Sequence, residues 1–319
     1  MKKEINFAVI GIGKISKKSV IPAFEKVTQA KLSCLASSNE SKIKALKKEY
    51  NQVAVCDYQT CLEDETINAV YIALPNHLHY EWTLKFLNAG KHVLCEKPLA
   101  LSLEEAKQMH ELAAEKNLIL REAFMYRTHA QHELVKNTLK DNLIGEPEIF
   151  QAAFTYDLKD LNNIRLKKKC GGGALYDVGC YLIDSIHYLF KTSIESVSVQ
   201  AEIGRESCVD EKTTLLFKCS NGMHAQLLCS TKLPRQQNYS IIGSKGSIYV
   251  PSSYIPVENQ KVSVFIRNDS GEQHKKLISE NQYASEIDEF CMCINKEDSG
   301  CLGFGLDTMR VIDEVRKLL

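Results

Sequence analysis

The chain has 319 residues, enough for two domains of ordinary size, and its 44% hydrophobic and 25% charged residues are typical of a globular protein rather than a disordered one. It has 40 basic and 40 acidic residues, so a formal net charge of zero gives no reason to expect nucleic acid or an anionic membrane as partner. No apolar run is long enough to span a bilayer, and no signal-peptide core follows the N-terminal lysines, so we expect a cytosolic protein.

Alternating strands and helices fill the first part of the chain. We expect short apolar strands at residues 5–10, 31–36, 53–56, 69–74, 92–95 and 118–120. Helical patterns lie between them, and the helix after Ser102 opens with a capping box because Glu105 stands three residues later. Fully apolar strands that alternate with helices are typical of a parallel sheet covered on both faces. Residues 1–123 are therefore predicted to form a doubly wound α/β domain.

The pattern changes near Ala123, after which several segments alternate between apolar and polar residues. We expect strands at 148–156, 193–203, 213–219, 223–230, 238–242, 246–250, 262–267 and 273–278, with helices at 131–140, 174–190, 282–294 and 307–318. This pattern predicts a second, α+β domain over residues 124–319 with a large open, mainly antiparallel sheet. One face of that sheet is available for association, so a homodimer or homotetramer is the expected assembly.

A glycine-rich loop joins the first strand to the first helix and contains Gly11, Gly13, Lys14, Ile15 and Ser16. Gly11 permits a tight turn, Gly13 lets a pyrophosphate approach the backbone, and the next helix points its free N–H groups at the phosphates. In this position the loop predicts a Rossmann domain that binds NAD or NADP. The alternative is a glycine turn in another doubly wound fold. Ser16 replaces the usual third small residue, which is expected to separate strand and helix slightly.

The choice of cofactor depends on the end of the second strand. NAD-dependent enzymes usually place an acidic residue there to bind the ribose diol. Here Ser37 and Ser38 follow the strand, no acidic residue stands at its tip, and Lys42 comes shortly after. The hydroxyls and the lysine suit a 2′-phosphate, although the usual arginine is missing. We therefore expect NADP rather than NAD.

A lysine stands at the end of the strand expected at 92–95, within the sequence Glu96-Lys97-Pro98. The carboxyl edge of a doubly wound sheet is where such folds bind their ligands. A lysine there can hydrogen-bond a substrate oxygen and stabilise alkoxide character during hydride transfer. The alternative is a surface lysine that caps the sheet, but its position between a strand end and a proline favours a function.

The helix expected at 174–190 begins after three glycines, residues 171–173, which let the backbone approach another group closely. Asp177, Tyr181 and Asp184 stand at i, i+4 and i+7, so they are expected to share one helix face. Such a polar face is unusual on a helix otherwise rich in Leu, Ile and Val. The alternative is a solvated helix edge with one packed aromatic residue.

The 12 cysteines include no CxxC pair, and most stand singly in apolar patterns, as Cys34, Cys95, Cys219 and Cys229 do. We expect structural, reduced thiols. No group of residues has the spacing of a zinc site, so no metal is expected.

Four segments together resemble the Gfo/Idh/MocA family, the group of glucose–fructose oxidoreductase and inositol dehydrogenase. They are the glycine loop and residues 75–79, 96–98 and 171–184. The likeness spans nearly the whole chain, and the motifs in this order are more specific than any one alone. The resemblance implies a Rossmann domain followed by a domain whose large open sheet commonly serves oligomerisation.

The resemblance also implies roles for particular residues. The catalytic lysine of the family falls on Lys97 and the acid–base position on Tyr181, where inositol dehydrogenases carry histidine. Glucose–fructose oxidoreductase, dihydrodiol dehydrogenases and several sugar-ketone reductases carry tyrosine there. A tyrosine has an unperturbed pKa of about 10, so Lys97 is expected to help make it a usable proton donor. Asp177 would orient these groups or bind a sugar hydroxyl.

Further positions follow from the same resemblance. The remaining residues expected to bind the cofactor are Pro75, Asn76, His79, Glu96 and Lys97. Arg127 lies in a Met-Tyr-Arg sequence that resembles the sugar-active branch, and it is expected to face the substrate. Arg165 is expected to contact substrate or cofactor, or else to belong to a solvated, lysine-rich loop.

The sequence therefore predicts an NAD(P)-dependent oxidoreductase that moves a hydride between nicotinamide C4 and a carbon bearing a hydroxyl or ketone. Tyr181 is expected to exchange the proton and Lys97 to polarise the oxygen of a sugar, a nucleotide-linked sugar or a cyclic diol. The alternatives are a non-catalytic NAD(P)-binding regulator of the same fold, an enzyme that recycles a tightly held cofactor, and a biliverdin-reductase-like role.

Overall fold

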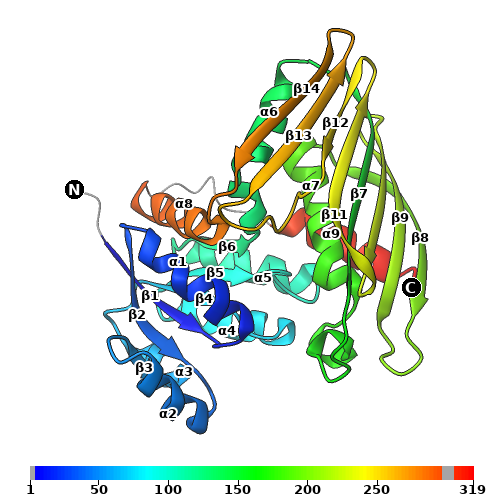
Figure 1. Ribbon diagram of the computed structural model, residues 1–319. Helices are drawn as coiled ribbons and strands as arrows, with labels where there is room; N and C mark the ends of the chain where they lie inside the picture. Colours follow the sequence, from blue (N-terminus) through cyan, green and yellow to red (C-terminus); the bar gives the residue numbers. More distant parts are fainter. Residues whose placement is uncertain (1–3, 297–304) are drawn as a thin grey trace. The chain divides into compact units, whose positions relative to one another are not determined.

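The computed structural model describes residues 4–296 and 305–319, and the chain divides into two compact units. Unit 1 comprises residues 1–125 and 283–306, and unit 2 comprises residues 126–282 and 307–319. Each unit is built on one sheet (Figure 1). The sequence predicted a single junction near residue 123, which assigned residues 283–306 to the second domain. Within the described residues, 283–296 cluster with the first unit.

Unit 1 contains a parallel, six-stranded sheet in the order β3-β2-β1-β4-β5-β6. Its strands are β1 (Ile5–Ile10), β2 (Ala30–Ala36), β3 (Ala54–Cys56), β4 (Ala69–Ile72), β5 (His92–Glu96) and β6 (Leu120–Ala123). The order changes direction between β1 and β4, so the loops after these two strands meet at a topological switch point, where doubly wound folds bind ligands. The predicted doubly wound fold is confirmed.

The helices of unit 1 lie mostly between its strands. They are α1 (Ile21–Ala23), α2 (Glu40–Glu49), α3 (Tyr58–Glu63), α4 (His79–Asn88), α5 (Leu103–Glu115) and α8 (Gln282–Lys296), with short turns at η1 (Ser16–Val20), η2 (Phe24–Lys26) and η3 (Asn76–Leu78). Helix α3 was not predicted. It is only six residues long and buries Cys61 alone, so it leaves little periodic pattern in the sequence.

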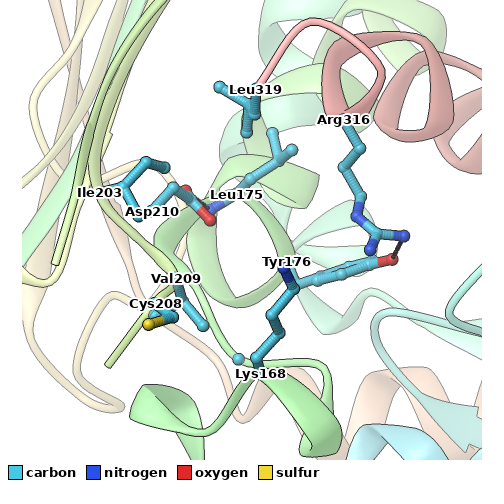
Figure 2. A pocket seen from close by; sticks show the side chains of 10 residues that line it. Lys168, Leu175, Tyr176, Ile203, Cys208, Val209, Asp210, Arg316 and Leu319 are labelled. Carbon is cyan, nitrogen blue, oxygen red and sulfur yellow. Dashed lines mark hydrogen bonds between the residues drawn. The ribbon is translucent and has the colours of Figure 1, made fainter. Parts of the chain in front are cut away.

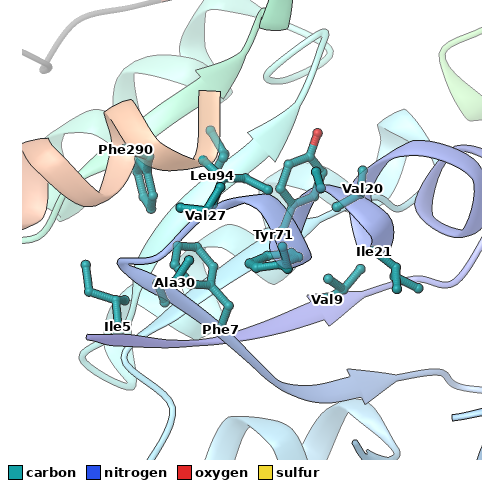
Figure 3. Packing of buried hydrophobic residues seen from close by; sticks show 14 of the residues in the cluster. Ile5, Phe7, Val9, Val20, Ile21, Val27, Ala30, Tyr71, Leu94 and Phe290 are labelled. Carbon is teal, nitrogen blue, oxygen red and sulfur yellow. The ribbon is translucent and has the colours of Figure 1, made fainter. Parts of the chain in front are cut away.

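Helix α8 belongs to unit 1 because its apolar face completes the core of that unit. Ile287, Phe290 and Cys291 are fully buried there. The ring centroid of Phe290 lies 6.1 Å from that of Phe7 in β1 (Figure 3). An apolar face repeated every three to four residues requires a partner surface, but the repeat does not say which surface that is. This is why the sequence pattern predicted the helix and not its unit.

Unit 2 contains an eight-stranded sheet in the order β14-β13-β12-β11-β7-β10-β9-β8. Its strands are β7 (Pro147–Asp157), β8 (Ile194–Ile203), β9 (Asp210–Cys219), β10 (His224–Ser230), β11 (Lys232–Gly243), β12 (Gly246–Val250), β13 (Lys261–Asn268) and β14 (Gly271–Ile278). Neighbouring strands are antiparallel, except that β7 and β10 run parallel. The predicted, mainly antiparallel sheet is confirmed.

One face of this sheet carries helices and the other is open. The helices of unit 2 are α6 (Ala130–Lys140), α7 (Cys180–Phe190) and α9 (Leu306–Arg316), and its short turns are η4 (Met125–Thr128), η5 (Ile164–Leu166), η6 (Lys168–Cys170) and η7 (Leu175–Gly179). Helix α6 packs against β13, and α7 packs against β7 and β10 (Figure 1). On the open face Leu216, Ile242 and Tyr249 are 52%, 39% and 44% exposed.

The cysteines differ from expectation at one position. Cys34, Cys95, Cys219 and Cys229 are thiols, as expected. Cys293 takes part in a disulfide bond, so the expectation of reduced thiols is wrong there. Within residues 4–296 and 305–319, no helix is long and apolar enough to cross a membrane.

Asp210, the first residue of β9, holds the start of the helical segment that carries Tyr181. That segment opens with the π-helical turn η7 and continues directly into α7. The Oδ2 atom of Asp210 accepts hydrogen bonds from the Leu175 N–H at 2.7 Å and from the Thr213 hydroxyl at 2.9 Å (Figure 2 shows Asp210 beside Leu175). Gly173 permits this approach, since a Cβ there would lie 2.1 Å from Asp210 Oδ1. A carboxylate at a helix N-terminus satisfies free N–H groups and the helix dipole.

Burial raises the pKa of Asp210 to about 6, against the lowering effect of the Leu175 and Thr213 hydrogen bonds. An unfolded aspartate has a pKa of about 3.9. The stability contributed by the protonated carboxyl is therefore complete below about pH 4 and is lost as the pH rises through about 6. We expect Asp210→Asn to remove this dependence. Between about pH 4 and pH 7, the free energy of unfolding of the natural protein should fall by up to about 3 kcal/mol relative to the variant.

Urea unfolding at a series of pH values measures this difference. Asp141→Asn serves as the control because Asp141 is an exposed carboxylate at the end of α6. The control should follow the pH profile of the natural protein. Parallel profiles for the natural protein and Asp210→Asn would contradict the prediction.

Candidate active site

The loop after β1 has the geometry that a dinucleotide pyrophosphate needs. Gly11 adopts a φ of +89°, and a Cβ there would lie 2.8 Å from the Ala73 carbonyl oxygen in the loop after β4. Gly13 is exposed, and nothing in the described part of the chain comes within 4 Å of where its Cβ would stand. The space over its backbone is therefore open to a phosphate, and this fits the cofactor that the sequence predicts.

Ser16 stabilises this loop through hydrogen bonds. Its hydroxyl donates to the Gly11 carbonyl oxygen at 2.7 Å and accepts from the Gly13 N–H at 3.3 Å, and the residue is fully buried. From the size of the serine, the sequence predicted only a wider gap between strand and helix. In the structure its hydroxyl also forms hydrogen bonds with the backbone of both glycines. Lys14 and Ile15 lie at the exposed rim of the turn, where Ile15 is 39% exposed.

The two serines after β2 differ in what they offer a ligand. Ser37 is buried, and its hydroxyl accepts a hydrogen bond from the Asn39 N–H at 3.3 Å. Ser38 and Lys42 are exposed, and Lys42 lies in the first turn of α2. Asn39 caps that helix by accepting from the Lys42 N–H at 2.9 Å. The groups available to a phosphate at this strand end are therefore Ser38, Lys42 and the N-terminus of α2.

The segment after β4 contains Pro75 and Asn76, which are half-buried, and His79, which is fully buried. The ring nitrogens of His79 lie 2.8 Å from the carbonyl oxygens of Leu74 and Pro98. Burial lowers the pKa of His79, although both carbonyls raise it. The sequence predicts that this histidine binds the cofactor. In the structure its ring contacts both the loop after β4 and the segment that carries Lys97.

Lys97 is half-buried directly after β5, and a cis peptide bond joins it to Pro98. The residues on either side are anchored. Glu96 Oε1 accepts a hydrogen bond from the Tyr71 hydroxyl at 2.9 Å, and the Leu99 N–H donates to Glu122 Oε1 at 2.8 Å. The lysine therefore stands on a short segment whose backbone is held at both ends.

Tyr181 lies in the first turn of α7 and is 3% exposed. Its ring centroid lies 5.4 Å from that of Phe154, 5.7 Å from that of Tyr254 and 5.8 Å from that of Tyr126. We call these four residues the aromatic cluster. Tilted contacts at such distances favour one ring orientation, so the direction of the Tyr181 hydroxyl is set by packing.

Asp177 is buried in η7, and its carboxylate contacts Tyr156 and Arg165. The Tyr156 hydroxyl donates to Asp177 Oδ2, and the Arg165 Nε lies 2.8 Å from Asp177 Oδ1. Gly172 lets the loop of Arg165 come close, because a Cβ there would lie 2.5 Å from the Arg165 carbonyl oxygen. The structure thus brings together Asp177 and Arg165, two of the residues expected to bind substrate, and the Arg165 side chain remains 43% exposed.

Arg127 has a different environment from the expected one. Its Nε donates to Asp184 Oδ2 at 2.8 Å, and its second guanidinium nitrogen donates to Asp184 Oδ1, so the pair is bidentate. The Tyr126 hydroxyl also donates to Asp184, which is completely buried, and the Arg127 side chain is only 9% exposed. The sequence expected Arg127 to face the substrate, whereas its charge is compensated by a buried carboxylate. Breaking such a pair is strongly destabilising.

A pocket of about 180 Å³ lies elsewhere in unit 2, lined by Lys168, Tyr176, Asp210 and Arg316 among others. The Arg316 guanidinium donates to the Tyr176 hydroxyl at 2.6 Å (Figure 2). Neither Asp177 nor Tyr181 lines this pocket. It lies beside the Asp210 cap of the helix, so we assign it no part in the chemistry.

Several residues that shape the site were not predicted: Phe154, Tyr156, Asp210 and Tyr254. They come from strands and loops that are distant in sequence from the helix they contact. No motif in the adjacent sequence indicates that they belong to the site. Tyr126 alone was in a segment that the sequence analysis selected, through its neighbour Arg127.

Comparison with known protein families and structures agrees with this geometry. Residues 5–124 match the family model described as oxidoreductase family, NAD-binding Rossmann fold, and residues 132–249 match the Gfo/Idh/MocA C-terminal domain. A dTDP-3,4-didehydro-2,6-dideoxy-alpha-D-glucose 3-reductase from Actinomadura kijaniata is 31% identical over 91% of this chain and 87% of the relative. The D-xylose 1-dehydrogenase (NADP(+)) 2 of Haloferax volcanii is 26% identical over 97% and 95%.

Solved structures point to the same family. A 3-ketoreductase from Actinomadura kijaniata, in complex with NADP and TDP-benzene, matches with a TM-score of 0.91 and 29% identity over 99% of this chain and 98% of that one. Structures of that reductase also exist with a tyrosine replaced by phenylalanine and with a lysine replaced by alanine or glutamate. The chain therefore belongs to the Gfo/Idh/MocA family of oxidoreductases.

Proposed function

We propose that the protein is an NADP-dependent reductase or dehydrogenase that acts on a hydroxyl or ketone carbon of a sugar, with a nucleotide-linked sugar as the first candidate. The observation that carries the proposal is the presence, in one chain, of an open dinucleotide loop at Gly13 together with Lys97 and Tyr181 on anchored segments. The relatives that act on dTDP-linked sugars and on xylose support this substrate class.

The nicotinamide, when bound, supplies or accepts the hydride. The backbone of the glycine loop binds the pyrophosphate, and Lys97 hydrogen-bonds the reacting oxygen of the substrate and stabilises negative charge on it. The Tyr181 hydroxyl donates its proton to that oxygen during reduction and takes it back during oxidation. Asp177, whose carboxylate is oriented by Tyr156 and Arg165, accepts a hydrogen bond from a neighbouring sugar hydroxyl.

Lys97→Met and Tyr181→Phe test these roles. Each removes a group that acts on the reacting oxygen, so turnover should fall about 100-fold or more, the usual contribution of a positioned acid or base. Affinity for NADPH should change little, because the glycine loop is untouched. A panel of aldoses, cyclitols and nucleotide-linked sugars, followed by nicotinamide absorbance with both cofactors, gives the rates.

Lys107→Met and Tyr249→Phe are the matched controls, since Lys107 is exposed on α5 and Tyr249 on the open sheet face. Near-normal turnover in both test variants would contradict the catalytic assignment. Nicotinamide absorbance that stays with the protein through gel filtration would instead favour an enzyme that recycles a tightly held cofactor.

The preference for NADP is expected to depend on Lys42. Only NADP carries the 2′-phosphate, so Lys42→Ala should weaken NADPH binding about fivefold and leave NADH binding unchanged, as expected for one exposed charge pair of about 1 kcal/mol. Lys47→Ala, at the other end of α2, is the control. Titration with each cofactor measures the affinities. A KM for NADH far below that for NADPH in the natural protein would contradict the NADP assignment.

We also propose that a second copy of the chain binds the open face of the sheet in unit 2 and that the protein works in the cytosol. Across this face, Gln226, Gln151 and Ser240 form a hydrogen-bonded row, which Leu216 flanks at one end and Tyr249 at the other. Exposed apolar side chains beside polar side chains that already hydrogen-bond one another are typical of an association surface. Ten of the described cysteines are free thiols, which supports the cytosolic location, whereas the disulfide bond of Cys293 does not.

Leu216→Glu combined with Tyr249→Glu tests the association surface. Burying two unpaired charges is costly, so the variant should sediment as a monomer at concentrations where the natural protein is a dimer or larger. Lys107→Glu in unit 1 is the control. Thermal unfolding of the monomeric variant should remain cooperative, because both side chains are exposed within one chain. An unchanged sedimentation coefficient, or a monomeric natural protein, would contradict the proposal.

A further inference from the structure

Three cysteines from different elements of unit 1 lie together near the end of β2. Cys34 lies in β2, Cys56 ends β3 and Cys61 lies in α3. The sulfurs of Cys34 and Cys56 are 3.2 Å apart, and the Cys61 thiol lies near enough to both for them to raise its pKa. The three cysteines form a cluster that the proposed reaction does not use.

The chemistry of the cluster favours oxidation over metal binding. Within residues 4–296 and 305–319, no group of three or more His, Cys, Asp or Glu residues has an arrangement suited to a metal ion. Hydrogen bonds from Cys34 and Cys61 lower the pKa of the Cys56 thiol, whereas the bond to Cys56 raises that of Cys34. Cys56 is half-exposed, while Cys34 and Cys61 are buried. Cys56 is thus the thiolate that a small oxidant reaches first.

We propose that Cys56 and Cys34 form a reversible disulfide when the protein meets a peroxide, and that this modification weakens binding of the cofactor. The Cys56 thiolate attacks one peroxide oxygen, the O–O bond breaks, and hydroxide leaves to give a sulfenic acid. The Cys34 sulfur then attacks the Cys56 sulfur, the S–O bond breaks, and the oxygen leaves as water with the Cys34 proton. Two thiols lose two electrons, and one hydrogen peroxide becomes two waters.

The consequence for the cofactor follows from the strand register and rests on the proposed function. Cys56 pairs with Ala36 and Cys34 pairs with Ala54. The two cysteines are therefore diagonal neighbours on adjacent strands rather than directly opposite each other. Bringing their sulfurs from 3.2 Å to the bonded distance of about 2.05 Å requires the strand ends to shift. The Cys56 carbonyl oxygen accepts a hydrogen bond from the Ser37 N–H at 3.1 Å. The shift therefore reaches the strand end that holds Ser37 and Ser38.

Peptide mapping tests the bond itself. The full-length, cofactor-free protein is reduced, desalted and treated with hydrogen peroxide, and its free thiols are then alkylated before trypsin digestion. We expect the peptide 32–42, which carries Cys34, to be linked to the peptide 49–85, which carries Cys56 and Cys61. Cys61→Ser and the distant control Cys229→Ser should keep the link. Cys34→Ser should abolish it, and so should Cys56→Ser, which alters a half-exposed position and keeps the test valid if Cys34→Ser does not fold.

The effect on the cofactor is measured with NADPH as the probe. Affinity should fall about tenfold or more after oxidation and return with dithiothreitol, and Cys56→Ser should show no loss. A link that persists in Cys56→Ser, or no link under conditions that oxidise the exposed Cys208, overturns the proposal. A link with unchanged NADPH affinity overturns its effect on the cofactor. Failure of the reduced protein to bind NADPH or NADH would instead contradict the proposed function.

Discussion

The hydrogen bond from the Leu175 N–H to the buried carboxylate of Asp210 sets where the helix of Tyr181 begins. The carboxylate can come this close only because residue 173 is glycine. Once the start is set, the π-helical turn and α7 place Tyr181 against Phe154 and Tyr254. Two of the three glycines that precede the helix, Gly172 and Gly173, thus make room for the protein's own carbonyl and carboxylate groups. Their close approach is to Arg165 and Asp210 rather than to a ligand.

Two carboxylates on this helical segment are each paired with an arginine, and the two pairs differ in exposure. The pair of Arg127 and Asp184 is buried and bidentate, so removing either partner would leave an uncompensated charge in the core. Arg165 is 43% exposed, and water competes for its pair with Asp177. Only the second pair can exchange a protein contact for a contact with substrate at low cost. The two pairs therefore differ in how accessible the arginine is to a ligand, and Arg165 is the more accessible.

The sequence predicted the features that local patterns encode. Apolar periodicity located nearly all strands and helices, and the glycine loop identified the doubly wound domain, because each signal lies within a few neighbouring residues. The pairing of Arg127 with Asp184 joins residues 57 positions apart, and no local pattern encodes it. The sequence position of His79 predicts cofactor binding, and it gives no sign that the ring contacts the carbonyl oxygens of Leu74 and Pro98. The sequence also did not indicate the unit to which α8 belongs, because the residues that α8 packs against are distant in sequence.

The hydroxyls nearest the cofactor loop are largely committed to the backbone. Ser16 bonds to both glycines of the loop, and Ser37 accepts from the Asn39 N–H. The exposed side chains at this strand end are those of Ser38 and Lys42, and the proposed recognition of the adenosine end rests on them. These groups are held in place by the end of β2, whose neighbour β3 carries Cys56. The proposed oxidation of the cysteine cluster and the proposed recognition of the cofactor therefore involve the same short stretch of strand pairing.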